Sequence, residues 1–307
     1  MPSQPSPSKQ PTNPNLIRSL RYYQKGVLNP EAWFGIVESD YTKIIDAVDW
    51  EALFPKERPD HTLLDIGCGT GQFPKMLRTK LAPAIPIHYD YLDPAQYCLT
   101  TCQQVLQPPF FPRHAWQTTW EHAEEVIIPG TYDIAWAIQS FYCLEQQTLY
   151  PSLDRLLRAL HPSRGTTCIV LAKCEAFFPQ VHRIFFQHCS QHTSPPYLTA
   201  ESVVTCLEEL GSKTVIREID CIHTISIRED RLLEQYLQQS VMDTTPLPQW
   251  KKNTHLHKFL ESYRHGDFYH FPNSYWLILS VPGSAGNEGR HRLQRYLKPV
   301  TSTQLSS

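Results

Sequence analysis

The chain has 307 residues, which corresponds to two average domains or to one α/β domain with an insertion. Its 28 Lys and Arg residues nearly balance its 30 Asp and Glu residues, so no large positive field exists to attract a nucleic acid or an anionic membrane surface. With 41% hydrophobic residues the chain can bury a sizeable core, and we expect no widespread disorder.

Cysteine usage and the N-terminal sequence bear on the location of the protein. The nine cysteines include no C-x2-C pair, which favours reduced thiols in a cytosolic protein. The polar N-terminal segment lacks the apolar stretch of a signal peptide, and no run of apolar residues is long enough to span a membrane. The sequence contains no H-E-x-x-H pattern, which would indicate a metal site. We therefore expect a soluble, cytoplasmic protein without a metal or a membrane partner.

The N-terminal part of the chain begins with a polar segment and continues with helical patterns. Residues 1–15 are rich in Pro, Ser, Gln and Asn, a composition that predicts a disordered tail. Residues 16–58 space their apolar and aromatic side chains as two or three helices would, and we expect them to form a lid. A short apolar strand over residues 62–66 then runs into a glycine-rich turn at residues 67–71, and a helix follows the turn.

The rest of the chain alternates strands and helices. Further strands are expected at residues 85–92, 132–138, 166–172, 214–227 and 275–281, and helices at residues 94–106 and 149–160. This alternation is typical of right-handed crossovers and a mostly parallel sheet. The long excursion at residues 229–274, just before the last strand, indicates a cap insertion. Residues 16–282 would then form one catalytic domain, and residues 283–307 a flexible tail.

The glycine-rich turn carries the clearest chemical signal. Asp65 stands at the end of the first strand, and Gly67, Gly69 and Gly71 follow at alternate positions, where positive φ angles let a ligand approach the backbone. The next helix offers its free N–H groups to the same ligand. The sequence lacks the third glycine of a dinucleotide fold, the lysine of a phosphate loop and the G-x-S-x-G elbow of a serine hydrolase. The turn therefore predicts a cofactor that is not a nicotinamide dinucleotide.

The pattern D-x-G-x-G-x-G at this position resembles motif I of the class I S-adenosylmethionine-dependent methyltransferases. The resemblance implies a Rossmann-like α/β fold, with a doubly wound sheet of seven mostly parallel strands and a helical lid. It also implies S-adenosylmethionine as the cofactor and S-adenosylhomocysteine as the product. Asp65 would accept hydrogen bonds from the turn or from the methionine amino group of the cofactor.

Other cofactor contacts follow from the same resemblance. In this family an acid at the end of the second strand binds the ribose hydroxyls, and Asp93 matches that place, with Asp90 as the alternative. Trp120 lies in the segment that packs against adenine, where a stacking role and a core role are both open. Ile138, at the end of the strand over residues 132–138, is implied as a further contact to the cofactor.

Within this class, scattered residues are similar to histamine N-methyltransferase and its relatives. The likeness rests on Y-D-I-A-W-A-I-Q-S-F-Y at residues 132–142, on F-P-N-S-Y-W at residues 271–276 and on the long insertion before the last strand. Three of these residues are implied in the acceptor site: Gln139 and Asn273 as polar contacts, and Tyr142 as an aromatic wall.

The likeness also asks for an acid in the N-terminal helices that holds a cationic substrate, and Glu38 or Glu31 matches this role. Cys143 stands where the relatives have a second tyrosine, and Phe177 and Phe178 replace an expected tryptophan pair, so the pocket should differ in shape from one for histamine.

Histidines in the segment after residues 166–172 are candidate acceptors for the proton of a protonated amine. His182, His188 and His192 lie there, but a solvent-facing or core position is expected for each of them.

These features predict an enzyme that transfers a methyl group from S-adenosylmethionine to a small molecule, with an amine nitrogen as the leading acceptor. The sulfonium is already an activated donor, so positioning contributes most and a dedicated base is optional. O-Methylation of a hydroxyl or carboxylate is the alternative within the class, and a non-catalytic module that binds the cofactor is the alternative outside it. We expect a monomer or weak homodimer without a nucleic-acid partner.

Overall fold

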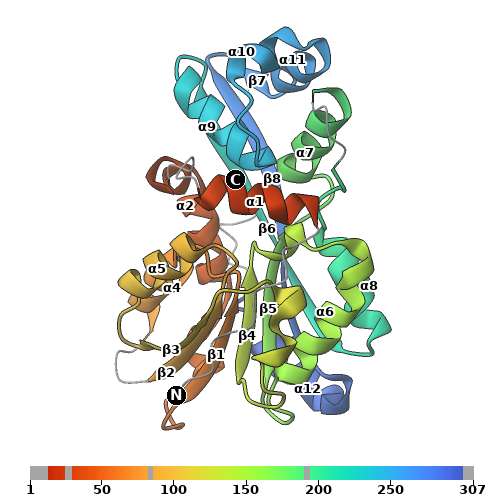
Figure 1. The fold of residues 1–307 in the computed structure, drawn as a ribbon. Helices are drawn as coiled ribbons and strands as arrows, with labels where there is room; N and C mark the ends of the chain where they lie inside the picture. Colours follow the sequence, from red (N-terminus) through yellow and green to blue (C-terminus); the bar gives the residue numbers. More distant parts are fainter. Residues whose placement is uncertain (1–12, 25–29, 82–85, 190–193, 300–307) are drawn as a thin grey trace.

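One mixed sheet organises the computed structural model, which describes residues 13–24, 30–81, 86–189 and 194–299 (Figure 1). Its strands are β1 (His61–Ile66), β2 (Ile87–Leu92), β3 (Phe110–Trp116), β4 (Ile134–Ile138), β5 (Thr166–Ala172), β6 (Lys213–Ser226), β7 (Arg264–His265) and β8 (Phe268–Val281). They lie in the order β3-β2-β1-β4-β5-β8-β6, and the short β7 pairs with the start of β8. Strands β1 to β5 are parallel, whereas β8 is antiparallel to both β5 and β6. The doubly wound, mostly parallel sheet expected from the sequence is confirmed.

Helices cover both faces of this sheet. They are α1 (Pro14–Gln24), α2 (Pro30–Ala47), α3 (Trp50–Leu53), α4 (Gln72–Leu77), α5 (Gln96–Val105), α6 (Gln146–Ala159), α7 (Phe177–His188), α8 (Ala200–Glu209), α9 (Asp230–Val241), α10 (Leu247–Lys252), α11 (Thr254–Glu261) and α12 (Gly286–Arg295). Helices α3, α4, α5 and α12 pack on one face, and α6 and α8 on the other. No helix in the described part of the chain is long and apolar enough to cross a membrane.

The burial of β1 follows from the period of two in a strand. Leu63 packs into the core beneath α4, while its neighbour Leu64 packs into the core beneath α6. Neither side chain is exposed to solvent. A strand that is buried on both faces reads as a continuous apolar run, which is why β1, β4 and β5 were evident in the sequence.

Strand β3 was not expected from the sequence. It lies at the edge of the sheet, and most of its residues are exposed, including Arg113 and His114. An edge strand pairs on one side only and needs no apolar run, so its pattern resembles that of a loop.

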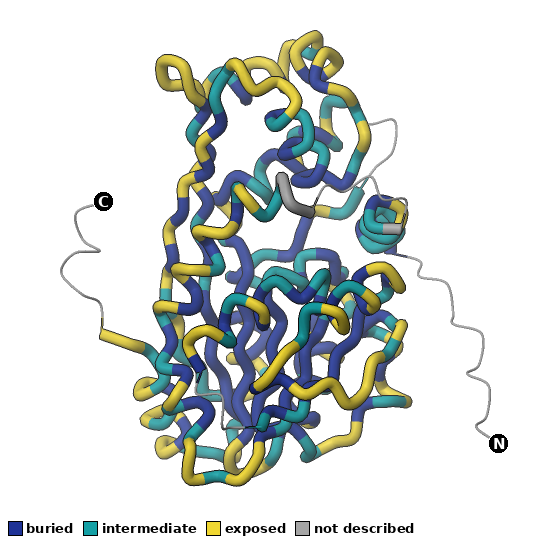
Figure 2. Tube along the Cα trace, turned by 90° about the vertical axis from the view of Figure 1, so that its left-hand side faces the viewer, coloured by how far each residue is buried: buried dark blue, intermediate teal, exposed yellow. Residues whose placement is uncertain are grey.

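The cap insertion is shorter than residues 229–274, because β8 already begins at Phe268. Tyr269, Phe271 and Asn273 are buried at alternate positions of this strand, which pairs with β6 along its whole length. Strands β6 and β8 therefore form a long ribbon that rises from the sheet to the cap, as the teal β6 and the blue β8 of Figure 1 show. Helices α7, α9, α10 and α11 surround the upper end of this ribbon with a third apolar core. The upper part of the trace in Figure 2 accordingly contains buried, dark blue segments.

The described parts of the two expected tails are folded, whereas residues 1–12 and 300–307 lie outside the described residues. Asn13 and Asn15 are buried, and α1 already begins at Pro14, inside the expected disordered tail. In the expected C-terminal tail, α12 packs against β6 and β8 through the fully buried Leu293. The apolar side chains of this helix are few, so its composition hid the contact.

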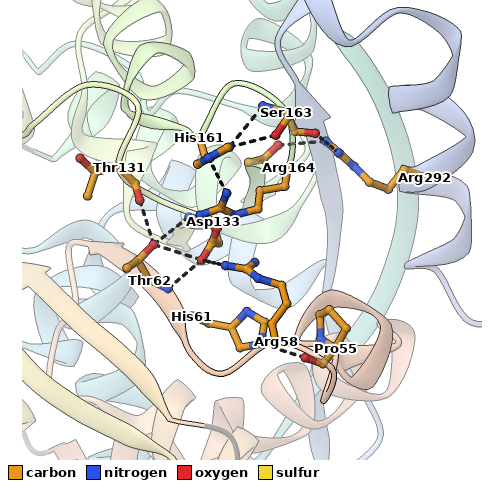
Figure 3. Close-up of polar contacts among 11 residues, drawn as sticks. Pro55, Arg58, His61, Thr62, Thr131, Asp133, His161, Ser163, Arg164 and Arg292 are labelled. Carbon is orange, nitrogen blue, oxygen red and sulfur yellow. Dashed lines mark hydrogen bonds and ion pairs between the residues drawn. The ribbon is translucent and has the colours of Figure 1, made fainter.

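A polar cluster joins α12 to the amino ends of β1, β4 and β5, as the labelled residues of Figure 3 show. Asp133 accepts hydrogen bonds from Arg58 at 2.8 Å, from the backbone N–H of Thr62 at 3.0 Å, and from Arg164. Arg292 of α12 donates to the backbone oxygen of Ser163 in the same loop as Arg164. Burial alone would raise the pKa of Asp133, but the hydrogen bonds outweigh it and the pKa is lowered.

Replacing Asp133 by Asn should lower the free energy of unfolding at pH 7 by about 2 kcal/mol, because two charge-assisted hydrogen bonds are lost. A group with a lowered folded-state pKa stabilises the fold above its unfolded pKa and ceases to do so as the pH falls through the folded value. Urea unfolding at pH 7 and at pH 3 should therefore show a smaller loss of stability on acidification in the variant than in the wild type. Equal losses in the two proteins would contradict this.

Candidate functional site

The glycine turn between β1 and α4 has the conformation that its sequence predicts. Gly67, Gly69 and Gly71 have φ angles of 73°, 51° and 74°, in the left-handed region that favours glycine. A Cβ atom at Gly67 would lie 2.6 Å from Cβ of Ser140, and one at Gly71 would lie 2.7 Å from Cγ2 of Val105. A Cβ atom at Gly69 would meet no atom within 4 Å. The outer two glycines thus allow close packing of the turn, and the middle one leaves open space for a ligand.

Asp93 follows β2 and stabilises the glycine turn through hydrogen bonds. Its carboxylate accepts the N–H of Gly69 at 3.1 Å and the N–H of Ala95 at 2.8 Å. Burial raises the pKa of Asp93 to about 6, although these two hydrogen bonds oppose the rise. Each oxygen keeps a free lone pair, so the carboxylate can still accept two further donors from a ligand.

Asp90, the alternative acid, is bonded elsewhere. Its carboxylate accepts hydrogen bonds from Nε of Arg113 and from the hydroxyl of Tyr132, both at 2.9 Å, and lies 3.0 Å from Nδ1 of His114. Burial would raise the pKa of Asp90, but the bonds from Arg113 and Tyr132 outweigh it and the pKa is lowered. Asp93 lines the pocket described next, and Asp90 does not.

A pocket opens at the carboxyl ends of β1, β2 and β4, where ligands of doubly wound sheets bind. Its empty space, counted together with the open mouth, measures about 1070 Å³. The N-terminal helices line one side of it: α1 through Leu16, Ser19, Leu20 and Tyr23, and α2 through Trp33, Phe34, Val37 and Tyr41. Aromatic rings therefore form much of this wall. None of the described lining residues comes from the cap insertion.

Asp65 is the second acid that lines the pocket. It is buried and accepts a hydrogen bond from the hydroxyl of Tyr89. Burial raises the pKa of Asp65 to about 7; the Tyr89 bond opposes this rise and the nearby Asp93 adds to it. Among the described residues, the pocket is lined by these two acids and by no Lys, Arg or His side chain. Its electrostatics favour a cationic or neutral ligand over an anion.

The residues that follow β4 form a further part of the pocket. Ile138, Gln139, Ser140 and Tyr142 all line it. Gln139 has a φ angle of 52°, which is uncommon for a residue with a side chain. Its Nε2 atom is buried and has no hydrogen-bond partner among the described residues. A buried donor of this kind marks a place where a ligand atom can accept a hydrogen bond.

Trp120, expected to contact adenine, lies outside the pocket. It begins a 3₁₀ helix (Trp120–Glu125) and is buried in the core beneath α6. Its indole Nε1 donates to the backbone oxygen of Ser152 at 3.1 Å, and Arg155 lies over its ring. Of the two roles left open, the structure supports the core role.

Two residues expected at the acceptor also lie elsewhere. Asn273 is buried behind the pocket wall, where Oδ1 accepts the N–H of Phe178 at 3.3 Å, and it does not line the pocket. Glu38 is exposed on α2 and does not line the pocket either. The side chain of Glu31 lies outside the described residues.

The histidines also lie away from the pocket, as far as the structure describes them. His182 is buried with its ring 3.7 Å from that of Tyr197, and burial lowers its pKa to about 3. His188 stacks on His255 at 4.0 Å, while His192 lies outside the described residues. The core or surface positions expected for the first two agree with these contacts.

The sequence did not show that aromatic residues of α1 and α2 line the pocket. Trp33, Phe34 and Tyr41 recur at helical spacing, a signal that indicates an apolar helix face without showing what that face covers. Cys143, noted as a departure from the expected tyrosine, does line the pocket.

Comparisons with known proteins bear on the fold. No family model matches the sequence, and no curated protein shows significant similarity to it. A proposed methyltransferase of Bacillus halodurans C-125 has a similar structure, with a TM-score of 0.53 and 13% identity over 79% of this chain and 98% of its own. A SAM-dependent methyltransferase of Leishmania major aligns with a TM-score of 0.50 and 15% identity, over 86% and 82% of the two chains.

A proposed histamine N-methyltransferase of Thermotoga maritima aligns with a TM-score of 0.46 and 13% identity, over 85% and 98% of the two chains, a likeness too weak to carry an argument about the acceptor. The first two structures, together with the strand order and the position of the glycine turn, show that this chain has the fold of the class I methyltransferases.

Proposed function

We propose that this protein transfers the methyl group of S-adenosylmethionine to a small molecule, and that an amine nitrogen is the acceptor. The observation that supports the proposal most is the meeting, in one pocket, of the glycine turn, two buried acids and an aromatic wall. The open space at Gly69 and the free lone pairs of Asp93 fit the cofactor, because its ribose carries two adjacent hydroxyls that need acceptors.

In this assignment each polar group at the turn holds one part of the cofactor. Asp93 accepts hydrogen bonds from the ribose hydroxyls, and Asp65 accepts them from the methionine amino group. Ile138 gives apolar contact on the β4 side of the pocket. When bound, the cofactor supplies an activated methyl group on a sulfonium, so these residues need only orient it.

The acceptor is assigned from the charge and chemistry of the lining residues. An amine acceptor would use its free lone pair to bond to the methyl carbon while the bond from that carbon to sulfur breaks, and it would then release a proton to solvent. A carboxylate acceptor would be an anion beside Asp65 and Asp93. An alcohol would need a base to remove its proton, and no histidine of the described chain lines the pocket.

Gln139 and Tyr142 are proposed to orient the acceptor. The buried Nε2 of Gln139 can donate a hydrogen bond, and Tyr142 contributes an aromatic side chain to the same pocket. Replacing Gln139 by Asn, which tolerates a positive φ and shortens the side chain, should reduce kcat/KM for the acceptor by about tenfold. The affinity for S-adenosylhomocysteine, measured by calorimetry, should stay the same. A loss of that affinity would contradict the proposed role.

The test of the function uses three acceptors with one shared ring: phenethylamine, 2-phenylethanol and phenylacetate. The purified protein is incubated with S-adenosylmethionine labelled in the methyl group, and transfer of the label is measured. We expect transfer to the amine alone. Transfer only to the alcohol or the acid would establish the O-methylation alternative. Binding of S-adenosylhomocysteine without transfer to any of the three would support the non-catalytic module.

A further inference from the structure

A buried polar network joins helix α2 to strands β6 and β8. Nε2 of His223 lies 2.9 Å and 3.0 Å from the two carboxylate oxygens of Asp40, and neither side chain has any exposed surface. The hydroxyl of Tyr275 donates to the same carboxylate at 2.8 Å. No Lys or Arg of the described chain forms an ion pair with Asp40, so hydrogen bonds satisfy this buried group.

The far side of His223 continues the network toward α9. Its Nδ1 atom lies 2.8 Å from the hydroxyl of Tyr236 and 3.2 Å from Nδ2 of Asn273. The N–H of Phe178 donates to Oδ1 of Asn273, which fixes the orientation of that amide and leaves Nδ2 as a donor. Nδ1 of His223 is then an acceptor, and Nε2 carries the proton that is shared with Asp40.

The same network reaches the pocket through Trp33. The indole ring of Trp33 lines the pocket and stacks on Tyr236 at 5.6 Å, with an angle of 25° between the ring planes. Asp40 lies two helical turns after Trp33 and directly before Tyr41, another pocket residue. Helix α2 is therefore attached to the β6–β8 ribbon at Asp40 and to α9 at Trp33, while its other aromatic side chains face the pocket.

We propose that Asp40 and His223 are positioning residues, whose directional bonds hold α2 so that Trp33 and Tyr41 form the acceptor-side wall of the pocket. Because well-packed apolar residues stabilise a helix contact at least as well as a buried polar pair, directional bonds of this kind serve orientation better than stability. The role in acceptor binding rests on the proposed function, whereas the placement of Trp33 can be measured without it.

The test compares Asp40→Asn with Asp46→Asn, a matched change at an exposed position of the same helix, in the full-length protein. Each protein is labelled with 5-fluorotryptophan, and the fluorine resonances of Trp33 and of Trp136, a pocket residue on β4, are assigned from single Trp→Phe variants. We expect Asp40→Asn to shift or broaden the Trp33 resonance and to leave that of Trp136 within its linewidth. Asp46→Asn should change neither resonance.

An unchanged Trp33 resonance in folded Asp40→Asn, or equal changes at Trp33 and Trp136, would overturn the proposal. If Asp40→Asn does not fold, Tyr275→Phe takes its place, because it removes a single hydrogen bond to the carboxylate of Asp40. This variant should shift or broaden the Trp33 resonance and leave that of Trp136 unchanged. An unchanged Trp33 resonance in Tyr275→Phe would overturn the proposal as well.

The kinetic readout uses phenethylamine. Asp40→Asn should raise KM by about tenfold and change kcat by less than about twofold, and a fall in kcat at constant KM would contradict a positioning role. Failure of the proposed function is recognised separately, because the wild type would then not methylate phenethylamine, whether or not it binds S-adenosylhomocysteine. The fluorine comparison still decides the placement of Trp33 in that case.

Discussion

Replacing Asp93 by Asn is expected to weaken the binding of S-adenosylhomocysteine by about 100-fold. Hydrogen bonds to a charged acceptor contribute about 1.5–3 kcal/mol each, and the proposed ribose contact uses two of them. The variant keeps an oxygen that can accept the N–H of Gly69 or Ala95, so the turn itself should remain folded. Titration calorimetry at pH 7.5 measures the affinity, and a change of less than threefold would exclude Asp93 as the ribose acid.

Asp90→Asn is the matched control, because this acid lies in β2, three positions before Asp93 in the sequence, and bonds to Arg113 instead of lining the pocket. This variant should lose stability but bind S-adenosylhomocysteine with wild-type affinity once folded. If Asp90→Asn weakened the binding of S-adenosylhomocysteine and Asp93→Asn did not, Asp90 would be the acid that binds the ribose.

The affinity should also depend on pH. Burial raises the pKa of Asp93 to about 6, so acidification below this value protonates its carboxylate. The protonated carboxyl group is a poorer acceptor for the two ribose hydroxyls. The wild type should therefore bind S-adenosylhomocysteine more weakly at pH 5 than at pH 8. Asp93→Asn removes one titrating acid, so its affinity should change less over the same range, with Asp65 as the remaining pH-dependent contact.

Replacing Gly67 by Ala is expected to lower the free energy of unfolding by about 3 kcal/mol. The left-handed conformation costs an alanine about 1–2 kcal/mol, and overpacking adds a comparable amount. The added Cβ would lie 2.6 Å from Cβ of Ser140, which cannot move aside easily because its hydroxyl donates to the backbone oxygen of Ile66 at 2.6 Å. Urea unfolding measures the loss, and the affinity for S-adenosylhomocysteine should fall with it because the turn shifts.

The variant Gly211→Ala is a control that separates the cost of the left-handed backbone conformation from the cost of steric overlap. Gly211 also has a positive φ angle, of 69°, but an added Cβ would meet no atom within 4 Å, and the residue is not among those that line the pocket. Its replacement should cost only the conformational term, about 1 kcal/mol, and leave cofactor affinity unchanged. Equal destabilisation of the two alanine variants would show that the contact with Ser140 is unimportant.

The choice between neighbouring acids illustrates what sequence patterns leave open. Glu38 and Asp40 are two residues apart on α2, a rotation of about 200° around the helix axis. One of them is exposed and the other is buried against His223. Only the strand that packs on α2 decides which face is covered, and that strand lies far away in the sequence.

The sequence by itself determined the alternation of strands and helices that gives a mostly parallel sheet, and the glycine turn after β1, because each depends on residues close together in the chain. Alternation of apolar runs sets the strands, and glycines at fixed spacing set the turn. The tertiary structure alone decided that α12 packs on the sheet, that Trp120 and Asn273 are buried outside the pocket, and that α1 and α2 supply its aromatic wall. These outcomes depend on contacts between segments that are distant in the sequence. An apolar or amphipathic side chain can be buried either in the core or in a ligand site, so its residue type alone does not distinguish the two positions.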